Sequence, residues 1–252
     1  MMSEVLTRVE GNVAHVTLNR PQARNAITVG LASALRNALS DAAVYADVIV
    51  LRGAGGHFSA GGDFHEVARL RAQGPEALRP LFETFIGACE LIAELPIPVV
   101  AAVEGVAMAG GFELIQSVDI AIVRDDAVLA DNHANFGMIP GGGGSQRLPR
   151  IVGPQRALGH LLTGDRISGA EAAAWGLVYR SVPPPAFEQA VAALVANLAG
   201  KDRAALGRIK HLVRTGLRGS LRDGLAMETA STLEHLAGHR AGAGIARFRE
   251  RP

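Results

Sequence analysis

The residues best suited to chemistry lie in one stretch, from Val103 to Asp119. An apolar run ends at Val103, and Gly110-Gly111 then opens a predicted short helix with Glu113 in its first turn. The first amide N–H groups of a helix lack partners within it and favour negative charge. A carboxyl group among apolar neighbours can also have its pKa moved toward working pH. Glu113 is therefore a candidate acid or base, although on this segment alone a purely structural role at the helix N-terminus is the simpler interpretation.

Two other glycine-rich loops could suggest a nucleotide site, but their spacing does not support one. The loop at residues 53–63 has no G-x-G-x-x-G pattern opening a helix, and the loop at 140–144 lacks the Gly-Lys-Ser/Thr of a phosphate loop. What remains is a pair of turns, at 60–63 and 109–111, that can present backbone N–H groups to a ligand. Two such donors converging on one carbonyl oxygen form an oxyanion hole, often the largest single contribution to catalysis.

The composition excludes several other classes of function. With 25 basic and 24 acidic residues, the net charge of +1 gives no electrostatic case for binding nucleic acid or a membrane. The single cysteine, Cys89, rules out a disulfide within the chain, so we expect a reducing, cytoplasmic location. No signal-peptide pattern opens the sequence, and no apolar run reaches the ~18 residues that span a bilayer. We therefore expect a soluble protein.

The elements that must position Glu113 alternate between strands and helices. Period-two alternation around Gly11 predicts a hairpin over residues 5–18, and leucines spaced by four after Thr28 predict a helix with one apolar face. Further elements are expected as strands at 48–51 and 120–123, a strand before the Glu113 helix, and a helix at 78–94. The alternation predicts an α/β core of repeated ββα-like units.

The C-terminal quarter has a different pattern. Three prolines at 183–185 mark the best boundary candidate, and the chain beyond them has an almost entirely helical pattern. Ahead of it, Ser168 and Glu171 form a predicted capping box, and the segment PGGGG at 140–144 forms the loop that we expect to be most flexible. We therefore expect a core with the site over residues 1–185 and a helical region, suited to oligomerisation, over 186–252.

Five segments carry a family resemblance. They read LNRPQARNAI (18–27), HFSAGGDFHEV (57–67), VEGVAMAGGFEL (103–114), FGMIPGGGGSQRLPR (136–150) and LTGDRISGAEAAAWGLV (162–178). Together they resemble the enoyl-CoA hydratase/isomerase (crotonase) superfamily over nearly the whole chain. The resemblance implies an α/β fold in which ββα units repeat in a spiral, followed by a helical C-terminal region. It specifies the family better than the reaction, because one scaffold here hosts hydratases, isomerases, hydrolases, decarboxylases and dehalogenases.

The resemblance also implies a substrate and the residues that bind it. The substrate is an acyl-CoA thioester, and neither a metal nor a cofactor is implied, since coenzyme A is part of the substrate. Gly62 and Gly110 match the two residues whose N–H groups bind the thioester oxygen and stabilise the enolate.

Four further residues match segments that border the coenzyme A moiety in this superfamily. Ala60 and Asp63 lie in one such loop, and Arg24 lies in the other, where a solvated surface role is the alternative. His65 follows the first loop and is a further candidate for contact with coenzyme A.

One catalytic position departs from the pattern of the hydratases in this superfamily. Glu113 matches their first catalytic glutamate, but counting back from Pro140 places His133 where the second is expected. His133 is either a hydrogen-bonded wall residue or a titratable catalytic group. Asp131, two residues earlier, could project similarly on an extended segment and is a second candidate.

From this resemblance we expect a lyase of fatty acid metabolism, a 2-enoyl-CoA hydratase that forms a homotrimer or homohexamer. The alternatives are an enoyl-CoA isomerase, an acyl-CoA decarboxylase or thioester hydrolase, and an acyl-CoA-binding protein with weak or no catalysis. The retained Glu113 argues against the binding protein, and the missing second glutamate argues for it.

Overall fold

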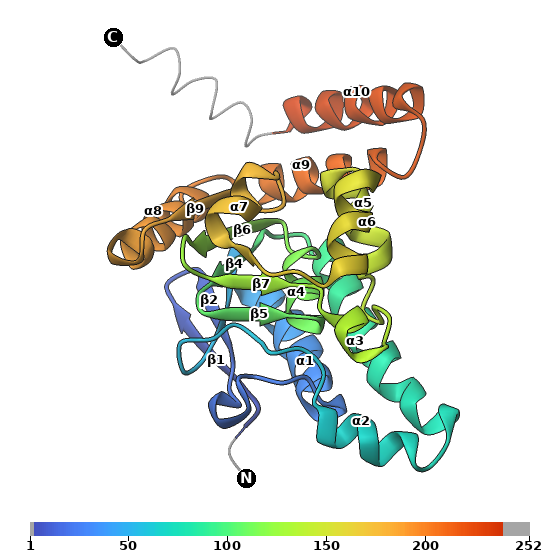
Figure 1. Cartoon of the computed structure of the whole chain (residues 1–252). Helices are drawn as coiled ribbons and strands as arrows, with labels where there is room; N and C mark the ends of the chain where they lie inside the picture. The colour runs from blue at the N-terminus through green and yellow to red at the C-terminus, as the bar shows by residue number, and fades with distance from the viewer. Residues whose placement is uncertain (1–2, 239–252) are drawn as a thin grey trace.

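A six-stranded sheet forms the centre of the computed structural model, which describes residues 3–238 (Figure 1). Its strand order is β1 (Val5–Glu10), β2 (Val13–Leu18), β3 (Val48–Gly53), β4 (Val99–Val103), β6 (Ile120–Arg124) and β9 (Arg180–Val182). β1 and β2 form the predicted antiparallel hairpin, and every other neighbouring pair in this sheet is parallel. The predicted α/β class is confirmed.

A smaller sheet positions the segments that contain Glu113 and His133. It consists of β5 (Val106–Met108), β7 (Val128–Ala130) and β8 (Ile167–Ser168), with β5 and β7 parallel. β5 leads into α4 (Gly110–Ile115), and β7 leads into the 3-10 helix η2 (His133–Phe136). Because parallel neighbours end at the same edge of a sheet, the segments that contain Glu113 and His133 start side by side.

Helices cover both faces of the large sheet. Its inner strands alternate, so that Ile49 and Leu51 pack into the main core with α1 (Val29–Tyr45) and α3 (Pro75–Glu94). Val48 and Val50 point to the other face and pack against α8 (Phe187–Ala199). This period-two division is what a strand buried on both faces requires.

The remaining elements complete the spiral and the C-terminal region. They are η1 (Pro21–Ala23), α2 (Phe64–Arg71), α5 (Gly144–Val152), α6 (Pro154–Thr163), α7 (Gly169–Ala174), η3 (Pro184–Ala186), α9 (Arg203–Gly216) and α10 (Leu221–Ala237). α10 packs along α9 and lies at the outer end of the molecule in Figure 1. Within residues 3–238, no helix is long and apolar enough to cross a membrane.

The local signals of the sequence correspond to real caps. The Thr28 hydroxyl accepts the N–H of Leu31 at 2.9 Å and starts α1, and Ser168 and Glu171 form the predicted capping box of α7. The helix expected at 78–94 begins three residues earlier, at Pro75, where a proline suits the first helical turn. Of the three prolines at 183–185, the first caps η3 and the other two lie in it. Beyond them, α8 packs against strands of the large sheet.

Candidate active site

An apolar cavity of about 150 Å³ lies beside the ends of β5 and β7. Its apolar lining includes Leu81, Phe82, Phe85, Phe64, Phe136 and Ile139, and its polar side chains include Glu113 and His133. At the mouth, the rings of Phe64 and Phe136 meet edge to face with centroids 5.4 Å apart, and both residues are more than half exposed. An apolar hollow with a few convergent polar groups is the usual form of a small-molecule site.

Two backbone N–H groups open onto this cavity. Gly62 and Gly110 both line it, and within residues 3–238 neither N–H has a hydrogen-bond acceptor in the protein. Gly110 is the first residue of α4, where a helix leaves its N–H unpaired. Gly110 is buried, whereas Gly62 is exposed. A buried N–H group is rarely left without a partner, so the N–H of Gly110, together with that of Gly62, is suited to bind an oxygen of a ligand.

Backbone contact holds the two donor turns together. A Cβ atom on Gly61 would lie 2.7 Å from the Cβ of Ala109 and 2.8 Å from the carbonyl oxygen of Met108, so only glycine fits there. Ala109 has φ +46° and ψ −117°, a conformation that disfavours any side chain. Its N–H donates to the carbonyl of Ala130 at 2.9 Å, which ties the turn to β7. Such strain persists only where the surroundings fix it, typically at functional sites.

A short parallel pairing fixes the Gly62 turn against the chain before α1. Ile27 N–H donates to the Gly61 carbonyl at 2.7 Å, and Asp63 N–H donates to the Ile27 carbonyl at 2.9 Å. Ala60 N–H donates to the Arg24 carbonyl at 2.8 Å. The predicted coenzyme A segments around residues 24 and 60 are therefore neighbours in the structure.

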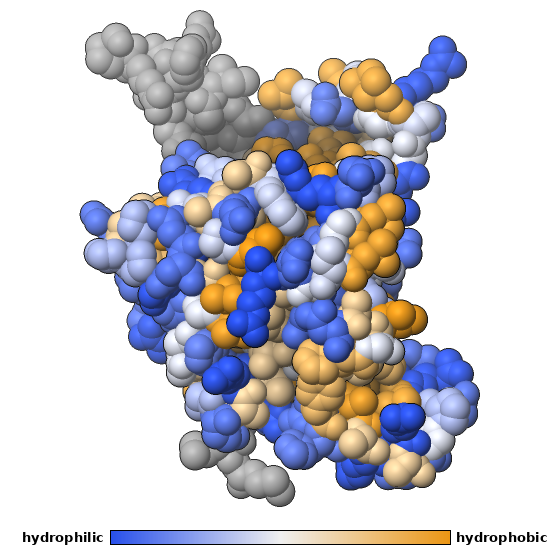
Figure 2. Space-filling model, viewed as in Figure 1, coloured by the Kyte–Doolittle hydropathy of each residue, from blue (hydrophilic) through white to orange (hydrophobic). Residues whose placement is uncertain are grey.

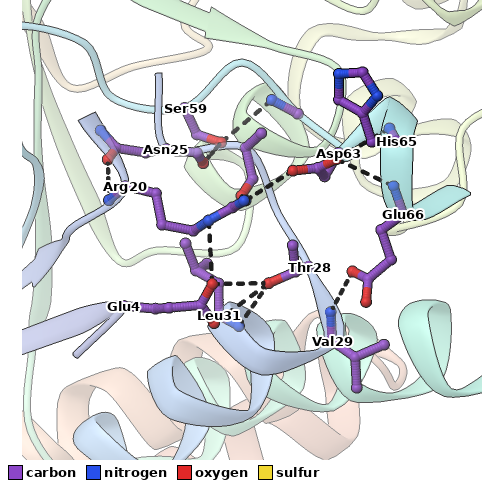
Figure 3. A network of polar contacts seen from close by, with 12 residues as sticks. Glu4, Arg20, Asn25, Thr28, Val29, Leu31, Ser59, Asp63, His65 and Glu66 are labelled. Atoms are coloured by element: carbon purple, nitrogen blue, oxygen red, sulfur yellow. Dashed lines mark hydrogen bonds and ion pairs between the residues drawn. The ribbon is translucent and has the colours of Figure 1, made fainter. Parts of the chain in front are cut away.

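Side chains extend this support into a polar network, shown in Figure 3. Arg20 lies 3.0 Å from Asp63 and 3.1 Å from Glu4, measured between nitrogen and carboxylate oxygen. The Asp63 carboxylate also accepts the N–H groups of His65 and Glu66 and so caps α2. Burial alone would raise the pKa of Asp63, but these N–H bonds and the guanidinium of Arg20 lower it below its ordinary value. The Asp63 side chain therefore braces the Gly62 turn.

Asn25 anchors the loop that precedes the Gly62 turn from within the protein. It is fully buried with φ +55°, and its side-chain amide donates to the carbonyls of Ala54 at 2.9 Å and His57 at 2.8 Å. Its side-chain oxygen accepts the N–H of Arg20 at 2.9 Å. Asparagine tolerates the left-handed conformation better than most residues, which explains its use here.

Glu113 is held by backbone N–H groups. It is 2% exposed, and its Oε1 accepts the N–H of Gly142 at 2.7 Å and of Gly144 at 2.8 Å. Burial raises the pKa of Glu113 above its ordinary value, and the two N–H bonds only partly offset this. A raised pKa suits the carboxyl group to accept and release a proton.

The loop expected to be most flexible is tightly packed around that carboxylate. A Cβ on Gly142 would lie 2.3 Å from the Phe85 ring, and one on Gly144 would lie 2.7 Å from an oxygen of Asp131. Arg147 also donates to the Gly142 carbonyl. Gly142 and Gly144 are needed for close approach, since a side chain on either would clash with its neighbours.

The opposite wall is formed by His133 and its partner. Nδ1 of His133 lies 2.5 Å from Oδ1 of Asp131, which is fully buried, whereas the imidazole retains 14% exposure. Burial would lower the pKa of His133, but the bond to Asp131 and the charges of Asp131 and Glu113 together raise it. The sequence predicted His133 as a wall residue or a titratable group, and the structure places it on the cavity in a carboxylate–imidazole pair.

Comparison with known proteins identifies the family of the chain. The family model for enoyl-CoA hydratase/isomerase matches residues 8–252. The chain belongs to the enoyl-CoA hydratase/isomerase family. It is 36% identical to a probable enoyl-CoA hydratase of Rhizobium meliloti, over 89% of this chain and 86% of that one. It is 34% identical to another from Rhodobacter capsulatus, over 87% and 84%.

Solved structures identify the fold in the same way. The crystal structure of an enoyl-CoA hydratase from Bacillus anthracis superposes with a TM-score of 0.93 at 31% identity, covering 98% of this chain and 96% of that one. The crotonase fold predicted from the sequence is thereby confirmed. Within this hydratase/isomerase family, the reaction depends on the groups around the cavity more than on the scaffold.

The other predicted substrate-binding residues of this family member lie in different places. Ala60 lines the cavity, whereas Arg24 and His65 are exposed beside the Gly62 turn. Within residues 3–238, no group of three or more His, Cys, Asp and Glu side chains could hold a metal ion. The expectation that no metal takes part stays a prediction.

Sequence reasoning did not single out His160. Its Nε2 accepts the N–H of Asp131 at 3.0 Å, and its ring is held between Phe112 and Trp175, with centroids 5.0 and 5.5 Å away. Burial lowers the pKa of His160, so it is a neutral acceptor. The available signal was its spacing three residues after buried Ala157 on α6, which indicates only a core position.

Proposed function

We propose that this protein is a 2-enoyl-CoA hydratase, a lyase that adds water across the Cα=Cβ bond of an acyl-CoA thioester. One observation carries the proposal: two unpartnered backbone donors, Gly62 and Gly110, open onto the same cavity as Glu113 and His133. That arrangement can bind a carbonyl oxygen while two titratable groups act on the adjacent carbons. Membership in the hydratase/isomerase family supports the thioester substrate.

In this proposal the pair of backbone N–H groups, Glu113 and His133 each have a separate role in the reaction. The thioester oxygen accepts the N–H groups of Gly62 and Gly110, which stabilise the enolate as negative charge develops. Glu113 takes a proton from the water whose oxygen bonds to Cβ. Protonated His133 gives a proton to Cα, and the proton held by Glu113 restores His133 through solvent, so atoms and charge balance over one cycle.

The cavity also supports an acyl group of a particular kind. Among the described residues that line it there is no Lys or Arg, and its walls are mainly aromatic and aliphatic. A distal carboxylate on the substrate would therefore find no cation other than His133, whose charge is already paired with Asp131, and its burial would cost free energy. The volume of about 150 Å³ is comparable to cavities that hold one benzene molecule. We infer a short or compact apolar acyl group.

For the coenzyme A moiety we propose contacts at the rim of the cavity. Arg24 and His65 are exposed beside the Gly62 turn and are available to phosphate and ribose groups. Ala60 contributes backbone surface, and Asp63 acts through its cap of α2 and its ion pair with Arg20. The proposal includes no metal and no cofactor besides the coenzyme A of the substrate, and it places the reaction in cytoplasmic fatty acid metabolism.

We also propose that the protein assembles as a homotrimer or homohexamer through its C-terminal helices. Apolar residues are visible on α10 in Figure 2. The exposed set on α10 includes Leu221, Leu225, Leu233 and Leu236, and Leu217 directly follows α9; each is more than half exposed. Contiguous exposed apolar surface favours a protein contact. Sedimentation at micromolar concentration should give a trimer or hexamer, and a monomer would refute the proposal.

The function is tested with a panel of enoyl-, malonyl-type and β-keto-acyl-CoAs. Crotonyl-CoA should lose its enoyl absorbance and gain the mass of one water, without release of free coenzyme A. An isomerase would shift a double bond with no change in mass, a hydrolase would release coenzyme A, and a decarboxylase would release carbon dioxide from the malonyl-type substrate. Any of these in place of hydration would overturn the proposal, and so would binding without turnover.

A further inference from the structure

The partner of His133 is a carboxylate with no evident structural purpose of its own. Asp131 follows β7 directly and is completely buried, and its Oδ1 meets Nδ1 of His133 at 2.5 Å. Within residues 3–238, its other oxygen, Oδ2, has no hydrogen-bond partner. A buried charge is expensive unless it is paired, and His133 is the one side chain paired with this carboxylate in the described structure. The pairing with His133 therefore explains how the buried carboxylate of Asp131 is stabilised.

Two neighbouring helices, α6 and α5, contact Asp131. His160 on α6 accepts its backbone N–H at 3.0 Å. Gly144, the first residue of α5, lies so close to Oδ2 that an added Cβ would come within 2.7 Å of it. The carboxylate is thus closely packed against the start of α5, where only glycine leaves space for it.

We propose that Asp131 is a positioning residue, which holds Nδ1 of His133 and presents Nε2 to the substrate. The kinetic consequences of this inference rest on the proposed hydration, whereas the pairing of Asp131 with His133 does not. A carboxylate on one imidazole nitrogen selects the tautomer, orients the ring and stabilises the imidazolium, as in carboxylate–histidine pairs of other enzymes. Nε2 is then the atom that delivers the proton to Cα.

The charged groups around the pair act in a consistent direction. On its own segment His133 faces Asp131, and from α4 it faces Glu113; both negative charges favour the imidazolium. Around Asp131, His160 is neutral, and Asp165 acts on His160 from beyond α6. Removing the charge of Asp131 should therefore leave Glu113 as the one negative group favouring protonated His133 among the interactions given by the structure.

The experiment uses the full chain with ¹⁵N-labelled histidine and follows His133 by NMR across pH, without substrate. His133→Gln identifies the signals of His133. In the unsubstituted protein, neutral His133 should carry its proton on Nδ1, and its titration midpoint should lie above that of a free histidine. In Asp131→Asn the midpoint should move to lower pH. Asp165→Asn, an exposed change of the same type, serves as the matched control and should leave His133 unchanged.

Kinetics on the same variants give the second readout. Asp131→Asn should lower kcat about tenfold or more with KM nearly constant, and the alkaline limb of the pH–rate profile should move with the NMR midpoint. Neutral His133 carrying its proton on Nε2, or a midpoint unmoved in folded Asp131→Asn, would overturn the positioning role. The tautomer in the unsubstituted protein decides the question even if Asp131→Asn does not fold. Absence of any hydration with the NMR results as expected would instead refute the proposed function and leave the pair in place.

Discussion

The two walls of the cavity carry titratable groups in different ways. Glu113 follows β5 and is fixed by N–H groups of the glycine loop, whereas His133 follows β7 and is fixed by the side chain of Asp131. Each pKa is raised, but burial is the main cause for Glu113, whereas for His133 burial lowers the pKa and the bond to Asp131 and the charges of Asp131 and Glu113 together outweigh it.

This difference shows how one scaffold can change its chemistry on one side only. The Glu113 wall depends on the backbone and on glycines that no other residue can replace without a clash. The His133 wall depends on two side chains, so two substitutions can replace a carboxylic acid with an imidazole there. The proton affinity of His133 consequently depends on a second titratable group, Asp131. The pH dependence of the His133 wall should therefore differ from that of the Glu113 wall.

The largest effect should come from the Glu113 wall. Glu113→Gln keeps the shape and the two N–H bonds but removes the base, so kcat should fall by about 10²–10⁴. Acyl-CoA affinity, measured by calorimetry with a saturated acyl-CoA, should change little. Near-normal turnover in the glutamine variant would show that this wall is not the catalytic one.

The proposed oxyanion donors, Gly62 and Gly110, lie between the two walls in the mechanism, and the loss of one should have the next largest effect. Gly110→Pro removes the N–H at the first position of α4, where proline is compatible with a helix. Activity should fall by at least about 10²–10³, the worth of one lost donor.

A matched control separates the lost donor from crowding at this position. Gly110→Ala keeps the N–H but introduces a Cβ 2.8 Å from Cδ1 of Ile27, a flexible end that can move. It should therefore retain much more activity than the proline variant. Equal activity in the two variants, with folding checked by circular dichroism, would remove the donor role.

A smaller effect is expected at the rim of the cavity. Arg24 is exposed, so an ion pair with a phosphate of coenzyme A would contribute as a surface pair does. Arg24→Ala should raise KM roughly two- to fivefold with kcat unchanged, and added salt should reduce the difference. Lys201→Ala, an exposed cation at the end of α8, is the control and should have no effect. Equal KM values for the two variants would show that Arg24 does not contact coenzyme A.

The smallest effect concerns stability at the Glu113 wall. Because burial raises the pKa of Glu113 in the folded protein, the folded state holds its proton more tightly than the unfolded state. Stability is therefore fully present below the ordinary glutamate pKa and falls as pH rises from there through the raised value. Glu113→Gln lacks this loss, so its melting temperature should exceed that of the unsubstituted protein at neutral pH. The difference should shrink toward pH 4, and a constant difference would contradict the assigned cause.

Much of the fold could be predicted because its signals are local. Thr28, Ser168 and the alternating residues of β1 and β2 mark element boundaries by chemistry that a few neighbouring residues decide. The strands β5, β7, β8 and β9 have two or three residues each, too few for a period to emerge. They are specified by pairing across the chain, which no local pattern carries.

The candidate site likewise contains residues that local sequence predicts and residues whose roles depend on tertiary contacts. Glu113 and the two glycines could be predicted, because helix ends and glycine turns have recognisable residue types. The roles of Asp63 and Asp131 could not, because each depends on a partner brought close by tertiary structure: Arg20 for one and His133 for the other. The tight packing of the glycine loop at 140–144 was also invisible, since glycine indicates close packing as readily as flexibility.

The pH–rate profile of His133→Ala tests the difference between the two walls most directly. If protonated His133 donates to Cα, kcat/KM of the unsubstituted enzyme falls as pH rises through the raised pKa of His133, above the ordinary histidine value. His133→Ala should abolish that limb and lower the rate at least about tenfold, and His133→Glu should recover part of the rate without the limb. A limb that survives unchanged in folded His133→Ala would contradict the account and leave Glu113 as the one side-chain catalyst of this cavity.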